Sequence, residues 1–220
     1  MHHTPELILC QSPRERLYMG RGEQGLRLLL EQPCPVAEGA RFRERLRLFS
    51  GVLHPGFVRV LGGGWSAHPG RVELVLEEVP GLPVSGLPGA WRSAGVAQVM
   101  AQVSGIVAAV HALGLGIGGL SPARVLLSRR QHLVARVVGF APIGSIGEDL
   151  RSMATIAREL AQDQPLHPEL AAALAALERA ELDAAGFHAL CARLSQPKMA
   201  PSASPAPMPT DAPTTTPAAL

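Results

Sequence analysis

Residues 111–127 read HALGLGIGGLSPARVLL, the form of a helix end, a glycine-rich turn, a Ser-Pro step and a short apolar strand. A loop between two rigid elements is a common place for catalytic side chains, because those elements hold them in fixed positions. Between His111 and Arg124, however, the stretch contains no carboxylate, amide or cationic side chain. The sequence therefore predicts the shape of a catalytic loop without the groups that would perform chemistry.

The segments upstream of this loop predict a small β-rich unit. We expect first an antiparallel sheet, then an amphipathic helix, and then two more strands around a glycine-rich loop. The helix is predicted from the spacing of Phe42, Leu46, Phe49 and Leu53. The expected ranges are 7–10, 16–20 and 26–33 for the first strands, with turns at SPRE and EQG, then 38–53 for the helix and 54–79 for the last two strands. The stretch GLPVSGLPG (81–89) is interpreted as a linker.

The downstream segments predict mostly helices. These are expected at about 94–113, 147–160, 167–180 and 184–194, with two short strands at 123–128 and 133–140. Residues 96–120 resemble a membrane span in hydrophobicity, but two glutamines, a serine, His111 and five glycines favour a buried core helix. From residue 196 onward Pro, Ala, Ser and Thr dominate, which is typical of a disordered tail.

Composition narrows the class of protein. The 220 residues are 47% hydrophobic, enough for a sizeable core, and the formal charge of +2 without a long basic run does not indicate nucleic acid as a partner. Three distant cysteines indicate neither a disulfide framework nor a metal site, so a reduced cytoplasm is expected. No signal peptide is expected. Abundant Ala, Gly, Pro and Arg suggest a GC-rich bacterial genome.

Five phrases, in order and at matching spacing, resemble the eukaryotic-like Ser/Thr protein kinase family as found in bacteria. They are LHPGFVRVLG (53–62), VELVLEEVPG (72–81), the loop at 111–127, VVGFAP (137–142) and DLRSMATIAREL (149–160). The resemblance implies an α+β, two-lobed kinase-like fold. A small β-rich N-lobe with one helix would span 5–80, a reduced and mainly helical C-lobe 81–195, and the tail 196–220.

The same resemblance shows which catalytic groups are missing. Gly119 stands where the family has the catalytic-loop aspartate, Ser121 at the loop lysine and Arg124 at the metal-binding asparagine. Gly139 replaces the aspartate of the DFG motif, and Arg45 replaces the glutamate of helix C. The strand-3 lysine is absent too, because the chain has a single lysine at 198. Phosphoryl transfer needs positioning groups and oxygen ligands for Mg²⁺, so neither catalytic residues nor a metal site are expected.

Apolar positions of the family survive. Val60, Phe49, Phe140 and Ile117 match a stack of side chains that couples the two lobes. Asp149 matches a residue that accepts hydrogen bonds from the catalytic-loop backbone. A carboxylate early in a helix is also explained as an N-terminal cap, and the sequence leaves both interpretations of Asp149 open.

The remaining motifs are interpreted as structural. GRGEQG (20–25) matches a phosphate-binding pattern, but a strand end followed by a turn is preferred over phosphate binding. His54 and His111 lie in phrases where histidine packs at loop junctions. The hinge around Glu77 and Val79 offers backbone groups for a purine, but no cofactor is expected without the lysine, the metal and the glycine loop.

The leading hypothesis is a pseudokinase that binds a protein, as a scaffold or as an allosteric regulator of an active kinase or another signalling protein. One alternative is a divergent ATP-binding transferase on the same fold, with Arg124 as the candidate cation of the cleft. Another is a decaying gene product.

Overall fold

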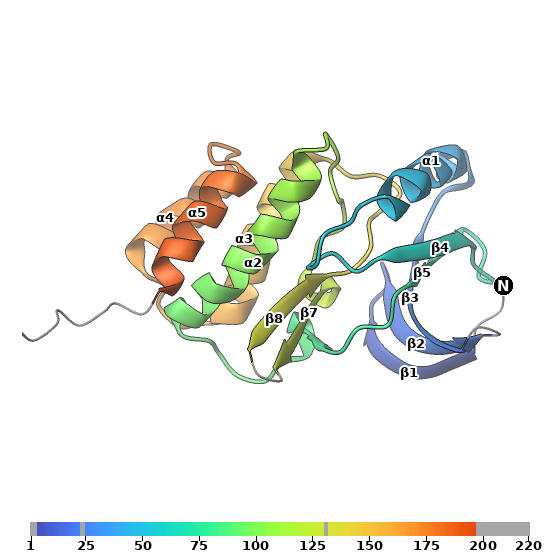
Figure 1. Ribbon diagram of the computed structural model, residues 1–220, viewed down its shortest axis with the longest axis horizontal. Coiled ribbons are helices and arrows are strands. Elements are labelled where there is room, and N and C mark those ends of the chain that lie inside the picture. Colours follow the sequence, from blue (N-terminus) through green and yellow to red (C-terminus); the bar gives the residue numbers. More distant parts are fainter. Residues whose placement is uncertain (1–3, 23–24, 130–131, 197–220) are drawn as a thin grey trace, which may run out of the picture.

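The computed structural model describes residues 4–22, 25–129 and 132–196, which form two lobes lying side by side (Figure 1). The smaller lobe contains a five-stranded antiparallel sheet with the strand order β1-β2-β3-β5-β4. Its strands are β1 (Thr4–Gln11), β2 (Arg16–Gly22), β3 (Gly25–Pro33), β4 (Val60–Trp65) and β5 (Arg71–Leu76). One helix, α1 (Gly39–Ser50), follows a 3-10 turn (Val36–Glu38) and lies beside β4.

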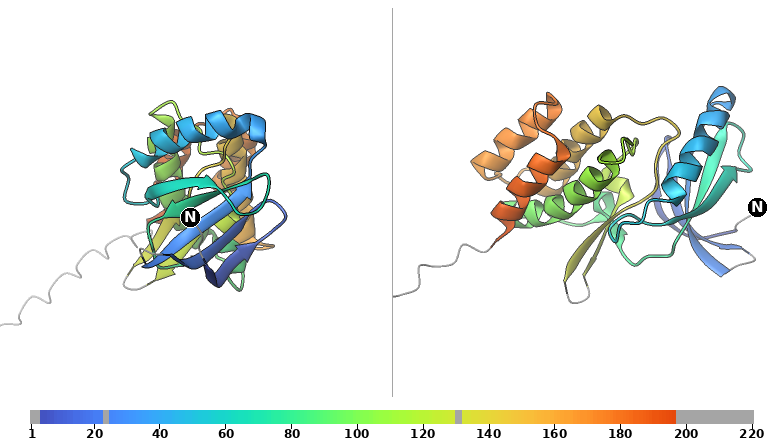
Figure 2. Two further views of the ribbon diagram at one scale, coloured as in Figure 1. Left: turned by 90° about the vertical axis from the view of Figure 1, so that its right-hand side faces the viewer. Right: turned by 45° about the horizontal axis from the view of Figure 1, so that its top comes forward.

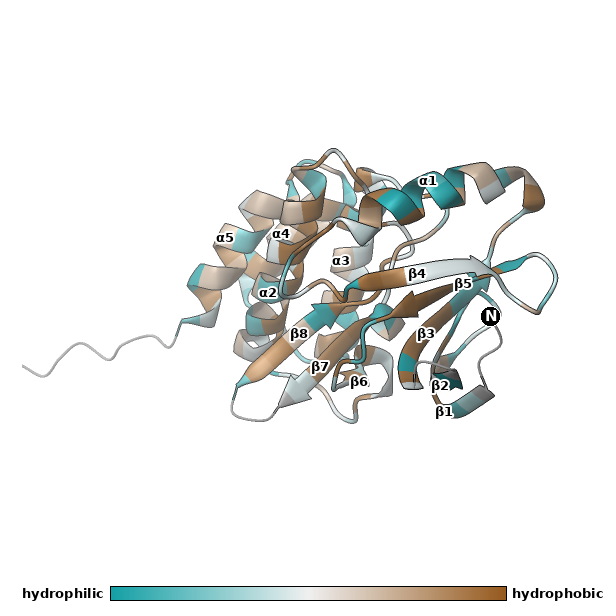
Figure 3. Cartoon of the chain, turned by 45° about the vertical axis from the view of Figure 1, so that its right-hand side comes forward, coloured by the Kyte–Doolittle hydropathy of each residue, from teal (hydrophilic) through white to brown (hydrophobic). Residues whose placement is uncertain are grey.

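The central strands of this sheet carry its apolar residues. The β5 sequence RVELVL alternates between half-buried and buried residues, and Leu28, Leu29 and Leu30 of β3 are all fully buried. Figure 3 shows the same pattern as brown bands along β3 and β5. The predicted strands of this lobe are therefore confirmed, since hydrophobic period and turn residues agree on them.

The GRGEQG stretch lies in the hairpin between β2 and β3. Gly22 ends β2, Gly25 begins β3, and the two glycines pair across the hairpin. The predicted strand end is therefore confirmed. Glu23 and Gln24, at the predicted turn, lie outside the described residues.

Two details of the small lobe differ from expectation. α1 buries Phe42 and Phe49 but ends at Ser50, so Leu53 lies beyond the helix with 84% of its surface exposed. The predicted glycine-rich loop is wrong as well, because the three glycines at 62–64 belong to β4. A Cβ at Gly63 would lie 2.7 Å from the carbonyl oxygen of Glu73, so glycine here permits the close approach of β4 to β5.

The larger lobe is built around α2 (Ser93–His111). It also contains α3 (Ile146–Ala161), α4 (Pro168–Glu178), α5 (Ala184–Ser195) and the sheet β6 (Leu82–Pro83), β7 (Val125–Arg129) and β8 (Leu133–Val137). The right-hand view in Figure 2 shows the helices packed together, with the β7–β8 hairpin beside them toward the small lobe. The predicted helices of this part are confirmed, as are its two strands, although the second ends at Val137 and not at residue 140.

α2 is long and apolar enough to cross a membrane by length and composition alone, and it is the one such helix among the described residues. In the fold, 56% of that apolar window is buried inside the protein. Val99, Val103 and Val107 lie on its fully buried side. α2 is therefore the core helix of this lobe, as the polar residues within it predicted.

The predicted linker at 81–89 is partly ordered secondary structure. Leu82 and Pro83 form β6 and pair with β7, and a 3-10 turn (Val84–Gly86) follows with Val84 buried. Gly81 makes this possible, since its φ is +145° and a Cβ there would lie 3.1 Å from the carbonyl oxygen of Leu127. Of the predicted tail 196–220, only Gln196 lies within the described residues.

Candidate functional site

The loop between α2 and β7 turns on glycines. Gly114, Gly118 and Gly119 have φ values of +72°, +67° and +64°, a conformation that costs other residues about 1–2 kcal/mol. A Cβ at Gly118 would also lie 2.4 Å from the Cα of Gly144, in the segment that joins β8 to α3. That segment therefore crosses in direct backbone contact with the loop.

Asp149, in the first turn of α3, holds this loop from within. Its carboxylate is fully buried and accepts hydrogen bonds from the backbone N–H groups of Ile117 (2.6 Å) and Gly118 (2.8 Å). The third partner is His111 Nε2, at 2.9 Å. The N-terminal cap of α3 is instead Ser145, which forms a reciprocal capping box with Glu148. The cap interpretation of Asp149 is therefore wrong, and His111 is a partner of Asp149.

Arg45 of α1 holds the same loop from the other lobe. Its Nη2 donates to the carbonyl oxygens of Gly116 (2.5 Å) and Ile117 (2.9 Å), and its Nε donates to that of Ala141 (2.8 Å). The guanidinium lies 5.0 Å from the ring centre of Phe49. Burial lowers the pKa of Arg45, and the nearby charge of Asp149 opposes that shift. The side chain at the position of the helix-C glutamate thus binds backbone carbonyls.

The four apolar residues that match the family's stack lie in one buried core. Phe49 and Phe140 stack with their ring centres 4.5 Å apart and their planes 17° from parallel. Ile117 is fully buried, and Val60 keeps only 3% of its surface exposed. Since α1, β4, the loop and the segment after β8 each supply one residue, this core is continuous across the two lobes.

Gly139 faces apolar side chains of the small lobe. A Cβ at this residue would lie 2.7 Å from Leu30 Cδ2 of β3 and 3.3 Å from Leu74 Cδ1 of β5. Both leucines are fully buried. The place that the resemblance assigns to a metal-binding aspartate is therefore occupied by hydrocarbon.

Arg124 is the centre of a polar network between the lobes. Its Nε donates to Glu15 Oε2 (2.5 Å), in the β1–β2 turn, and its Nη2 donates to Gln32 Oε1 (2.7 Å), in β3. Ser121 donates to the other oxygen of Glu15 at 2.9 Å, and Gln32 Nε2 donates to the Phe140 carbonyl oxygen at 2.7 Å. Sequence reasoning missed Glu15 and Gln32, because neither lies in a motif.

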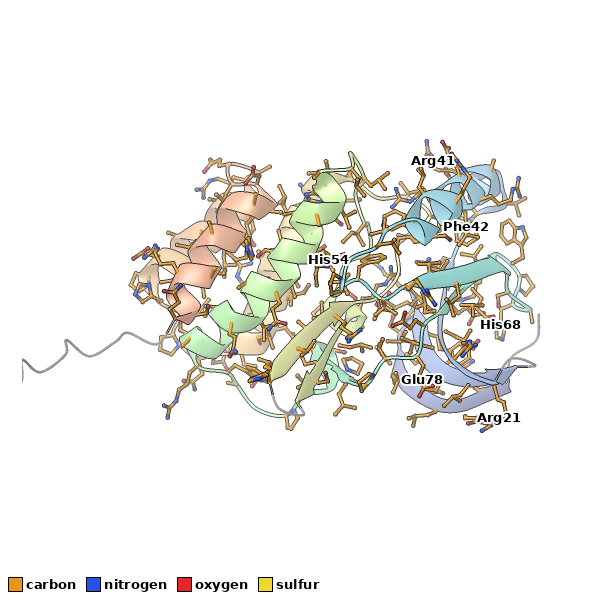
Figure 4. The ribbon with its side chains drawn as sticks, viewed as in Figure 1. Arg21, Arg41, Phe42, His54, His68 and Glu78 are labelled. Carbon is orange, nitrogen blue, oxygen red and sulfur yellow. The ribbon has the colours of Figure 1, made fainter. Side chains whose placement is uncertain are left out.

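The hinge segment and His54 have structural partners. The Glu77 N–H donates to the Arg59 carbonyl oxygen (2.9 Å), and the carboxylate of Glu77 lies 3.5 Å from Arg59 Nε. Val79 is buried, whereas Glu78 is exposed where the chain passes between the lobes (Figure 4). His54 Nδ1 accepts a hydrogen bond from the Gly56 N–H at 3.1 Å, which fits the predicted packing role at a loop junction.

A cavity of about 640 Å³ opens at the cleft side of the loop. The β1–β2 turn, the loop and α3 all contribute to its wall, including Glu15, Gly119, Ser121 and Arg124. Nowhere in the described ranges are three or more His, Cys, Asp or Glu side chains grouped so that they could hold a metal ion. The cavity is thus polar but has no cluster of metal-binding side chains.

Among comparisons with known proteins, only that with solved structures gives matches, and these bear on the fold. No protein-family model and no curated protein matches the chain. A point variant of the Mycobacterium tuberculosis PknI kinase domain superposes with a TM-score of 0.64 at 18% identity, covering 88% of this chain and 96% of that one. Rad53 in complex with AMP-PNP superposes with a TM-score of 0.59 at 14% identity, covering 88% and 60%. The chain therefore has a protein kinase-like fold.

Proposed function

We propose that this chain, which has a protein kinase-like fold, is a catalytically inactive domain that acts by binding another protein. Its role would be that of a scaffold or an allosteric regulator in bacterial cytoplasmic signalling. The observation that carries the proposal is the Arg124 network, in which side chains of the two lobes bind each other across the cleft.

The network opposes the binding of a metal–nucleotide complex. Arg124 and Glu15 are both nearly buried, so a ligand that separated them would leave a charge unpaired at a cost of about 3–5 kcal/mol. Mg²⁺ requires oxygen ligands, whereas the matching positions here present a guanidinium at Arg124 and hydrogen at Gly139. Glu15, a carboxylate in the wall of the cavity, is already bound by Arg124 and Ser121.

The contact between Gly139 and Leu30 also argues against the binding of phosphate and metal. A lysine on β3 and an aspartate after β8 would have to face each other to bind phosphate and metal. Leu30, which is fully buried, instead lies against Gly139, where a built Cβ would be 2.7 Å from Leu30 Cδ2. Restoring one charged residue here would bury it among leucines without a partner, which is strongly unfavourable.

The fold of the domain is stabilised by contacts that do not involve phosphate or metal. Asp149 and Arg45 fix the loop backbone, and the aromatic stack joins the lobes. A rigid two-lobed surface is sufficient for binding a protein, and it does not need a nucleotide site. This combination favours a binding role over the divergent transferase.

Nucleotide titration tests this function. A ligand present at a hundred times its dissociation constant stabilises a domain by about 2.7 kcal/mol, which raises Tm by roughly 5–10 °C at this size. We expect millimolar ATP and Mg²⁺ to raise Tm no more than the same concentration of inorganic triphosphate and Mg²⁺. A saturable rise in Tm beyond that of triphosphate would overturn the nucleotide-free account and favour the divergent transferase.

A further inference from the structure

The cavity beside the loop has more donors than its own residues can satisfy. Its wall includes three arginines from three different segments and three hydroxyl groups. These are Arg14, Arg124 and Arg151, with Ser121, Ser152 and Thr155. The Ser121 hydroxyl already donates to Glu15, and that of Thr155 donates to the Arg151 carbonyl oxygen. The arginines and Ser152 are therefore the donors that suit an anion with several acceptor oxygens.

Arg124 supplies the decisive observation. Only 3% of its surface is exposed, and Nη1, unlike Nε and Nη2, is a buried nitrogen without a hydrogen-bond partner among the described residues. A Cβ at Gly119 would lie 3.0 Å from this Nη1, so the nitrogen lies directly beneath an exposed glycine of the cavity wall. A buried charged donor without an acceptor is costly, so the site favours a ligand that provides one.

The charges around the cavity do not cancel. The carboxylate of Glu15 is bound by Arg124 and Ser121, and that of Glu148 accepts from the Ser145 N–H at 3.1 Å. Arg14 and Arg151 are exposed, and neither has an ion pair within the part of the chain that the structure describes. Two cationic side chains therefore remain available at the cavity, in addition to the free nitrogen of Arg124.

We propose that this cavity binds the phosphoryl group of a phosphorylated serine or threonine in a partner protein. A phosphorylated side chain has close to two negative charges and three acceptor oxygens at neutral pH, which match the arginines and the Ser152 hydroxyl. This inference rests on the proposed function and specifies the chemistry of the partner.

The wall favours a phosphorylated side chain over a nucleotide. Leu120, Pro33 and Pro142 are the largest apolar residues that line it, and none of the lining residues is aromatic. Beyond the cavity, Leu30 of the small lobe lies directly against Gly139, where a built Cβ would be 2.7 Å from Leu30 Cδ2. A compact dianion on a flexible chain fits this geometry.

Calorimetric titration with a defined phosphopeptide tests the site. The probe is an acetylated heptapeptide of alanine and glycine with one central phosphothreonine, and the unphosphorylated peptide is its control. We expect saturable binding of the phosphopeptide alone. Arg151→Gln and Arg14→Gln should each weaken it about tenfold, since each loses a charged hydrogen bond. Arg43→Gln, at an exposed residue of α1 outside the cavity, should leave the affinity within about twofold.

Each other result overturns the site. Absence of binding, or equal binding by wild type and Arg151→Gln, would reject the cavity while leaving an inactive domain in place. Inorganic phosphate binding as tightly as the peptide would reject a partner segment as the ligand. ATP binding more tightly than the phosphopeptide would assign the cavity to a nucleotide. The proposed function is tested by a separate measurement, because detectable phosphoryl transfer would overturn it whatever the cavity binds.

Discussion

The two sides of the loop at 115–124 are held by different kinds of contact. On the inner side, the charged groups of Asp149 and Arg45 bind the loop's own backbone N–H and carbonyl groups. On the cleft side, Arg124 and Ser121 bind side chains of the other lobe. The shape of such a loop depends on the partners of its backbone, whereas its chemistry depends on a few side chains. One can therefore be lost while the other is kept.

Loss of the inner carboxylate should have the largest effect. Asp149→Ala leaves two buried N–H groups and His111 without their acceptor, so we expect unfolding free energy to fall by about 3–5 kcal/mol. Urea denaturation measures the change. Asp163→Ala, at an exposed turn residue, should change it by less than about 0.5 kcal/mol. Equal effects for the two variants would show that the carboxylate of Asp149 does not stabilise the loop.

Substitutions at Gly114 and Gly118 distinguish the cost of backbone strain from the cost of a steric clash. Gly114→Ala should cost only the left-handed backbone strain of about 1–2 kcal/mol, since no atom lies within 4 Å of the new Cβ. Gly118→Ala adds a clash with Gly144, worth about 1–3 kcal/mol more. Thermal unfolding of both proteins gives the difference. If Gly118→Ala is no worse than Gly114→Ala, the crossing segment does not pack against the loop as described.

On the cleft side, we expect the effects of two substitutions on the unfolding free energy to compensate each other. Arg124→Met alone leaves Glu15 nearly buried without its cation, and we expect a loss of about 3 kcal/mol. Adding Glu15→Gln should restore stability to within about 1 kcal/mol of wild type, because whole buried ion pairs are often replaceable. A double-mutant cycle in urea measures the coupling. Additive losses would show that the two residues do not act as a pair.

Substitution of Arg45 should cost less than substitution of Asp149, Gly118 or Arg124. Arg45→Met keeps an apolar stem over Phe49 but removes the hydrogen bonds to three carbonyl groups, so we expect a loss of about 2 kcal/mol. Arg47→Met, at an exposed position of the same helix, is the matched control. A result near zero for Arg45→Met would show that α1 contributes little to the loop's shape.

The helices and strands could be predicted from the sequence because the hydrophobic period and the turn residues indicate the same boundaries in most segments. The prediction failed at Leu53, where an apolar repeat continued past the glycine at 51 that ends α1. At the site, the resemblance led to Asp149 and to the missing charges. It did not lead to Glu15 and Gln32, which meet Arg124 across 109 and 92 residues of sequence. Such contacts depend on how the lobes pack, and no local pattern encodes them.

We propose that the cleft performs no phosphoryl transfer. Incubation of the purified chain with radiolabelled ATP, Mg²⁺ or Mn²⁺ and generic protein substrates measures this directly. The account predicts no incorporation above the level of a blank without the protein. Incorporation that follows the protein through successive columns, and that Ser121→Ala abolishes, would contradict it.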